Sequence, residues 1–225
     1  KIKEGYCILA GDRNFSLVEG LLRGTNLNVI CVAKDPQTVA KMRSTFDKAQ
    51  LFDKRLLTVI EADPQTFNAP PHIASLLIAD NVELTDNLQA SIRPFGGVSI
   101  EIDAESIQKL QTQSGPPAGS DDWAQEFHDA ANTLASGDQL VKAPLGLLWY
   151  GGEAADARFY FDGHVDHQSG HGLNPQPVSA HVVDGRMILQ GPGLLGAIDI
   201  YTGRLLWETE LPKVYTFGGG GGHVI

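Results

Sequence analysis

The fold of the first half is decided by the stretch YCILAGD, residues 6–12, an apolar run of strand length that ends in a glycine and an acidic residue. A second apolar run, VICVA, follows at residues 29–33. Between the two runs, apolar residues recur at helical spacing from Leu17 to Leu22, and Gly24 supplies a stop signal. The pattern predicts a β-α-β unit.

The same alternation continues along the chain. Pro36 suits the first turn of a second helix, because the amide that proline lacks would have no partner there. Further strand-length runs follow at residues 56–60, 75–79 and 97–102. Five strands alternating with helices or short crossovers predict a Rossmann-like α/β domain over residues 1–104, with a parallel sheet covered on both faces.

A connecting region is predicted over residues 105–120. The stretch from Ile107 to Gln113 predicts a helix, and the run SGPPAGS at residues 114–120 is typical of a linker. Residues 121–225 are therefore expected to form a separate unit.

Candidate binding residues follow the predicted strands, because ligands of such sheets bind beyond the carboxyl ends of the strands. These positions hold Gly11, Asp12, Asp35, Asp63 and Asp80. An acidic side chain after the second strand can accept hydrogen bonds from both hydroxyls of a ribose. Asp35 and Asp63 each precede a proline, so a helix N-cap is an alternative role for both.

This arrangement resembles the class I S-adenosylmethionine-dependent methyltransferases over about residues 3–103. The resemblance is carried by Gly11 in the first turn, Asp35 at the ribose position, Glu61-Ala62-Asp63 at the adenine-contacting position and the segment IRPFGG at residues 92–97. It implies S-adenosylmethionine as the cofactor.

The chain departs from that family in its first turn. A glycine-rich run is reduced here to AGDRNF, residues 10–15, with Asp12 and Arg13 where the cofactor would lie. The last two strands of the family are not evident either. We therefore expect a degenerate domain with a structural or binding role, and an active methyltransferase is the alternative.

The second half changes character at residue 178. Four strand-length runs, at residues 178–183, 186–190, 194–200 and 204–210, are separated by turn-forming residues. They predict a four-stranded antiparallel meander, which is the blade unit of a β-propeller.

The last of these turns carries a specific motif. The run AIDIYTGRLLW at residues 197–207 fits A-x-D-x-x-T-G-x-x-x-W and resembles the tryptophan-docking repeat of pyrroloquinoline-quinone-type propellers. Asp199 can cap the turn, Thr202-Gly203 form it with a positive φ at the glycine, and Trp207 stacks between neighbouring blades. These roles are structural.

Two upstream segments resemble the start of such quinoprotein-like propellers. They are DDWAQEFHDAANT at residues 121–133 and a predicted strand, PLGLLWY, at residues 144–150. We therefore interpret the chain as a fragment of a large quinoprotein-like protein, whose partners are its remaining blades or further copies of the chain. Part of a quinone-dependent dehydrogenase is a further alternative, in which a complete propeller would hold pyrroloquinoline quinone.

The densest group of potential metal ligands lies in the loop GHVDHQSGH, residues 163–171. His164, Asp166, His167 and His171 could bind zinc or another transition metal. No helix fixes these side chains on one face, so contact with a substrate or partner and a solvated or hydrogen-bonded loop are the alternatives.

Composition restricts the partners. A net charge of -10 without any basic run argues against a nucleic-acid partner. No apolar stretch approaches the roughly 20 residues of a membrane helix, so a soluble protein is expected, with bacterial cytoplasm and periplasm both open. Cys7 and Cys31 lie in apolar strand-like runs and are expected to be buried hydrophobic residues.

Overall fold

A computed structural model describes residues 2–12, 15–50, 57–103, 106–113, 115–152, 180–191 and 193–212. The chain divides into two compact units, Lys1–Gly115 and Pro116–Ile225. Among the described residues, no helix has both the length and the hydrophobicity of a membrane span.

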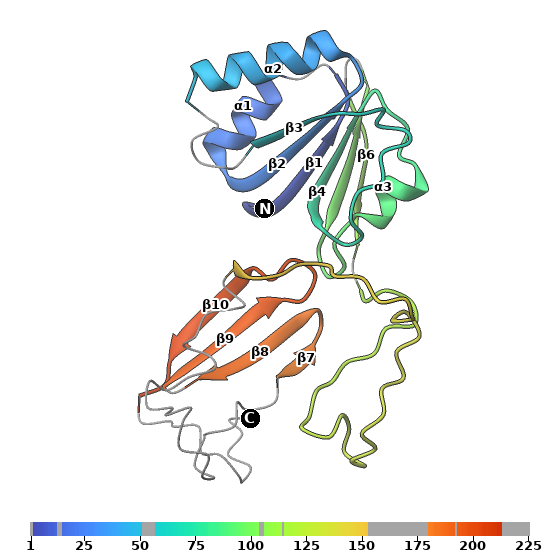
Figure 1. Ribbon diagram of the computed structural model, residues 1–225, viewed down its shortest axis with the longest axis vertical. Coiled ribbons are helices and arrows are strands. Elements are labelled where there is room, and N and C mark those ends of the chain that lie inside the picture. The colour runs from blue at the N-terminus through green and yellow to red at the C-terminus, as the bar shows by residue number, and fades with distance from the viewer. Residues whose placement is uncertain are drawn as a thin grey trace. The chain divides into compact units, whose positions relative to one another are not determined.

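The first unit is built on a six-stranded sheet with the order β3-β2-β1-β4-β5-β6 (Figure 1). Neighbouring strands among the first five are parallel, with β1 between β2 and β4. This arrangement confirms the predicted Rossmann-like sheet. The five strands are β1 (Glu4–Ala10), β2 (Asn26–Ala33), β3 (Leu57–Glu61), β4 (Ala74–Asp80) and β5 (Val98–Ile102).

The sixth strand corrects a sequence prediction. Residues Ile107–Thr112 form β6, antiparallel to β5, where the sequence predicts a helix. Ile107 and Leu110 have helical spacing, but their side chains are 65% and 63% exposed. Because no apolar helix face is buried here, pairing with the free edge of β5 determines the conformation instead.

Helices cover both faces of this sheet (Figure 1). The helices α1 (Phe15–Gly24) and α2 (Pro36–Lys48) pack on one face, and α3 (Asp86–Ala90) packs on the other. Cys7 and Cys31 are free and fully buried in the core beneath α1 and α2, as the sequence predicts. Burial raises the pKa of Cys31 to about 12, so this thiol is inert at neutral pH.

The second unit contains a four-stranded antiparallel sheet with the order β10-β9-β8-β7. This confirms the predicted meander. A propeller composed of several such sheets remains a prediction. The strands are β7 (His181–Val183), β8 (Arg186–Gly191), β9 (Leu194–Asp199) and β10 (Leu205–Glu210).

The predicted strand at residues 144–150 is not formed in the described part of the unit. A strand needs a neighbouring chain for its backbone hydrogen bonds, and none pairs with this segment among the described residues. Upstream, Trp123 and Val182 of β7 exchange two backbone hydrogen bonds of 2.8 Å, so this part of the chain is fixed to the sheet edge.

Candidate functional site

The candidate site of the first unit is the carboxyl edge of its sheet, where Gly11 follows β1. Gly11 has a φ of +137° and donates its amide to the carbonyl oxygen of Val32 at 3.0 Å. A Cβ atom at this position would lie 2.3 Å from the carbonyl oxygen of Asp80, the last residue of β4. The glycine is therefore needed for the close approach of two strands of the same chain.

Lys34 connects three strand ends at this edge. Its backbone amide donates to Oδ1 of Asp12 at 3.0 Å, and its ammonium group donates to Oδ2 of Asp63 at 2.6 Å. Asp63 also accepts the amide of Gln65 at 3.1 Å. The hydrogen bond from Lys34 lowers the pKa of Asp63, and the same contact raises the pKa of Lys34.

Asp35 is the N-cap of α2, as one of its two predicted roles requires. Its carboxylate accepts the hydroxyl of Thr38 at 2.7 Å, the amide of Thr38 at 2.9 Å and the amide of Gln37 at 3.2 Å. These bonds, led by that from the Thr38 hydroxyl, lower the pKa of Asp35. The residue that ends β2 itself is the buried Ala33. For Asp63, the predicted helix cap is wrong, because Asp63 begins a turn rather than a helix.

Asp80 completes the edge and is only 2% exposed. Its carboxylate accepts the side-chain amide of Asn81 at 3.2 Å. Asn81 has a positive φ of 53° and donates its own amide to the carbonyl oxygen of Ile102. Asp80 therefore belongs to a turn that joins the ends of β4 and β5.

Three of the carboxylates predicted to bind a cofactor, Asp12, Asp35 and Asp63, already accept hydrogen bonds from the chain itself. The bond between Lys34 and Asp12 joins the ends of β1 and β2, next to the point between β1 and β4 where the strand order reverses and where sheets of this kind bind ligands. The carboxylate of Asp35 already accepts three hydrogen bonds from its own helix. Sequence reasoning missed Lys34, although a cation among four predicted carboxylates was a usable signal.

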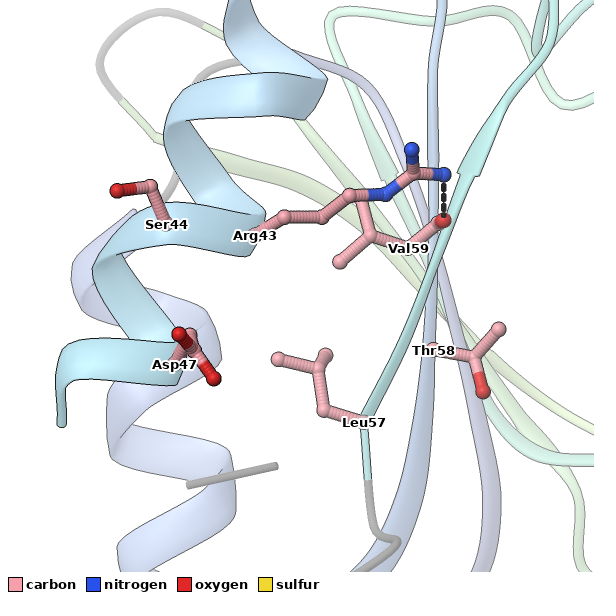
Figure 2. Close-up of a pocket in the computed structure, with 6 residues that line it drawn as sticks. All are labelled: Arg43, Ser44, Asp47, Leu57, Thr58 and Val59. Carbon is pink, nitrogen blue, oxygen red and sulfur yellow. Dashed lines mark hydrogen bonds between the residues drawn. The ribbon is translucent and has the colours of Figure 1, made fainter. Parts of the chain in front are cut away.

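A cavity of about 620 Å³ lies elsewhere in this unit, between α2 and β3 (Figure 2). Leu57 and Val59 face the helix, whereas Thr58 points away from it. Nη2 of Arg43 donates to the carbonyl oxygen of Val59 at 2.8 Å. The cavity lies along the first residues of β3, away from the carboxyl edge of the sheet. The guanidinium group of Arg43 gives the carbonyl oxygen of Val59, on this edge strand, a hydrogen-bond partner.

The comparisons with known proteins found no matching family profile and no matching curated protein. Solved structures of similar shape include an RNA methyltransferase from Salinibacter ruber in complex with S-adenosyl-L-homocysteine, at 17% identity and a TM-score of 0.41 over 51% of this chain and 84% of that one. A SAM-dependent methyltransferase from Aquifex aeolicus matches at 16% identity and a TM-score of 0.39, over 52% and 64%.

A third match is phosphoethanolamine N-methyltransferase 2 from Haemonchus contortus, in complex with S-adenosyl-L-methionine. It is 17% identical, with a TM-score of 0.38 over 45% of this chain and 25% of that one. The chain spans about half or less of three further solved structures, namely 49%, 40% and 38% of their lengths. TM-scores below 0.5 do not assign a function to this chain.

The predicted metal ligands His164, Asp166, His167 and His171 lie outside the described residues. Within the part of the chain that is described, no three His, Cys, Asp or Glu side chains gather closely enough to hold a metal ion.

The repeat motif of the second unit forms the turn predicted for it. Oδ1 of Asp199 accepts the amide of Tyr201 at 3.1 Å, and its carbonyl oxygen accepts the amides of Thr202 and Gly203 at 3.3 and 2.8 Å. Gly203 has a φ of +70°. The cap and the positive φ are therefore as predicted, while stacking of Trp207 between blades remains a prediction. Trp207 lies on β10 and is 42% exposed.

A different tryptophan packs against this turn. Nε1 of Trp149 donates to the carbonyl oxygen of Ile200 at 2.7 Å, and its ring lies against Gly203. Trp149 also contacts the core cluster of the sheet. Sequence reasoning placed Trp149 at the end of a strand and missed this contact, because the two partners are 51 residues apart.

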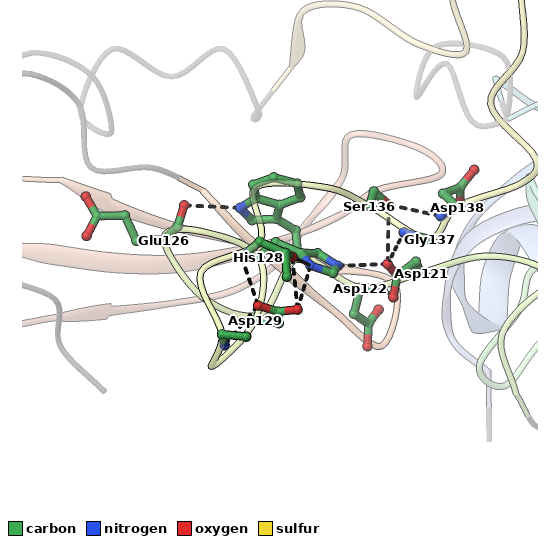
Figure 3. Close-up of polar contacts among 11 residues, drawn as sticks. Asp121, Asp122, Glu126, His128, Asp129, Ser136, Gly137 and Asp138 are labelled. Atoms are coloured by element: carbon green, nitrogen blue, oxygen red, sulfur yellow. Dashed lines mark hydrogen bonds and ion pairs between the residues drawn. The ribbon is translucent and has the colours of Figure 1, made fainter.

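A polar cluster lies in the segment before Trp149 (Figure 3). Nε2 of His128 is 2.8 Å from Oδ2 of Asp121, and Nδ1 is 3.1 Å from the hydroxyl of Thr133. The order carboxylate, imidazole, hydroxyl is that of nucleophilic sites. Here, however, the Thr133 hydroxyl also donates to Asp129 at 2.9 Å, and Oδ2 of Asp121 accepts the amide of Gly137. These contacts connect the ends of a loop, which is a structural role.

Proposed function

We propose that the first unit is a Rossmann-like domain with a structural or binding role and without S-adenosylmethionine chemistry. The observation that carries the proposal is the position of Lys34, whose two groups bind Asp12 and Asp63 at the ends of the neighbouring strands. A nucleotide would have to displace both contacts before it reached the strand ends. The capping of α2 by Asp35 supports the same conclusion.

We further propose that the sheet of the second unit is one blade of a larger quinoprotein-like propeller. The turn around Asp199 and Gly203 and the packing of Trp149 on it support this assignment. A single four-stranded sheet cannot bury both of its faces. The remaining blades of the same protein, or further copies of the chain, would cover it. A quinone-dependent dehydrogenase would need the complete set of blades.

An S-adenosylmethionine-dependent methyltransferase is the second candidate for the first unit. The sequence alone predicts five strands, which makes the methyltransferase-like core look shortened. The structure adds a sixth, β6, which runs antiparallel to β5 at the end of the order β3-β2-β1-β4-β5. The core is therefore less shortened than the sequence indicates, and this favours the second candidate. The ion pair between Lys34 and Asp63 is exposed, and exposed pairs contribute little to stability. A ligand could therefore displace it at a small cost.

Isothermal titration with S-adenosylmethionine and S-adenosylhomocysteine distinguishes the two candidates. We expect no binding heat with the unmodified chain. Micromolar binding that is lost in Asp35→Ser would overturn the structural role, since serine can still cap α2 but lacks the carboxylate.

A second variant tests the closing contact itself. Lys34→Ala removes the ammonium contact with Asp63 and keeps the backbone contact with Asp12, so binding gained in this variant would show that the contact between Lys34 and Asp63 closes the edge. Lys48→Ala, at the last residue of α2, is the matched control and should bind no better than the unmodified chain.

A further inference from the structure

The second unit exposes an unusual number of large apolar side chains in one stretch, residues 134–150, called here the apolar segment. Leu145, Leu147 and Tyr150 are 76%, 78% and 85% exposed. Soluble monomers seldom expose an apolar patch larger than about 300–600 Å², and larger ones mark interaction sites. The other exposed apolar residues of the segment are Leu134, Leu140, Val141 and Leu148.

The end of this segment also lacks backbone partners in the described part of the chain. From Leu145 to Tyr150, no amide or carbonyl group has a hydrogen-bond partner among the described residues. The segment is nevertheless held in place, because the indole of Trp149 donates to the carbonyl oxygen of Ile200. A fixed stretch of chain whose backbone groups have no partner among the described residues is a template for pairing with another strand.

The distribution of charge along the chain favours a second copy of the same chain as the partner. The chain carries a net charge of -10, so two copies repel each other over most of their surfaces. Residues 143–152, APLGLLWYGG, include no charged side chain. When this stretch meets the same stretch of a second copy, apolar side chains face apolar side chains and no like charges are opposed.

The segment also has apolar surface to contribute to an interface. One partner of a standard protein interface contributes roughly 800 Å²; the paired residues supply Leu145, Leu147, Leu148 and Tyr150 to it, and Leu134, Leu140 and Val141 of the same segment add further exposed apolar surface. We propose that the apolar segment is a homodimer interface, in which residues 145–150 of two copies pair as antiparallel strands about a two-fold axis near Leu147. Such an interface is self-complementary, as two-fold symmetry requires. The proposal does not depend on whether the first unit binds a cofactor.

Sedimentation velocity over a range of concentrations tests the proposal on the full chain. We expect a species of twice the chain mass. The double variant Leu145→Glu/Leu147→Glu should weaken the dimer roughly 100-fold, because its carboxylates would be buried without partners. Both positions are exposed within one chain, so the variant should fold, and its circular dichroism should match that of the unmodified protein.

A control at a similarly exposed apolar residue makes the result specific. Ile107→Glu on β6 should leave the dimer intact. A chain that is monomeric at every concentration, because another segment or another protein covers the apolar segment, would overturn the proposal. So would a dimer that Ile107→Glu dissociates and the double variant does not.

Disulfide trapping tests the position of the axis. Leu147→Cys should form an intermolecular disulfide under mild oxidation, because residue 147 of each copy lies beside its symmetry mate. The native Cys7 and Cys31 are buried and should not react. Ile107→Cys is the matched control and should give no dimer band; equal cross-linking at the two positions would contradict the proposed interface.

Discussion

The indole ring of Trp149 covers the α-carbon of Gly203 so closely that a Cβ atom at position 203 would lie 2.6 Å from Cε3 of the ring. Gly203 is also the residue of the turn that needs a positive φ. Glycine is therefore needed at position 203 for two reasons: the turn requires a positive φ, and the Trp149 ring leaves no room for a side chain. Through this contact the chain that precedes the sheet is anchored to it.

Gly203→Ala should destabilise the second unit by about 1–3 kcal/mol, because the added methyl group overlaps the Trp149 ring and the positive φ strains the backbone. Chemical denaturation followed by far-ultraviolet circular dichroism measures the change. Gly20→Ala, in α1 with open space around it, is the opposite case and should stabilise the first unit by roughly 0.5–1 kcal/mol. An unchanged stability of Gly203→Ala would mean that the ring does not occupy this position.

Trp149→Phe separates the hydrogen bond from the packing. Phenylalanine retains an aromatic ring but cannot donate to the carbonyl oxygen of Ile200, so the unit should lose about 0.5–1.5 kcal/mol. Trp149→Ala should cost more, since the ring also leaves the core cluster. Hydrogen exchange of β8 and β9 reports both losses. Equal effects of the two substitutions would show that packing contributes little.

Gly11→Ala tests whether the first turn is shaped by the protein itself. The new Cβ atom would lie 2.3 Å from the carbonyl oxygen of Asp80, so β1 and β4 would have to move apart. We expect a loss of about 1–3 kcal/mol in the free energy of unfolding, in the absence of any ligand. Gly115→Ala has open space and should have almost no effect. A stable Gly11→Ala variant would indicate that the glycine serves a ligand instead.

The parallel sheet could be predicted because its strands are buried on both faces. The stretch ASLLIAD of β4 is buried at every residue, and such runs are visible as continuous apolar sequence. The edge strand β6 could not be predicted, because its side chains are largely exposed and its apolar residues, Ile107 and Leu110, fit a helix equally well.

The sequence predicts where the carboxylates of the candidate site lie, at the ends of the strands, but not which groups they contact. The rule that ligand sites lie beyond parallel strands identified Asp12, Asp35 and Asp63. It could not show that Lys34 binds two of them, because those partners are 22 and 29 residues away in the sequence. Local partners could be predicted better, as the cap of α2 by Asp35 demonstrates.

The polar cluster around His128 should make the second unit sensitive to acid. The pKa of Asp121 is lowered first by the hydrogen bond from the amide of Gly137, at 2.6 Å, and then by His128. Thr133 lowers the pKa of Asp129 in the same way. A carboxyl group whose pKa is lowered by folding stabilises the folded state fully above its ordinary pKa, 3.8 for Asp. That contribution is lost as the pH falls below this value.

The unfolding free energy of the unmodified chain should therefore decrease as the pH is lowered from about 5 to below 3.8, and Asp121→Asn should flatten this dependence. Asparagine can still accept the Gly137 amide, so the loop should keep its conformation. Asp122→Asn is the matched control, since among the described residues Asp122 accepts longer bonds, of 3.3 and 3.4 Å, from the amide of Asp184. Denaturation series at several pH values give the slopes. A slope in Asp121→Asn as steep as in the unmodified chain would mean that the cluster does not couple protonation to folding.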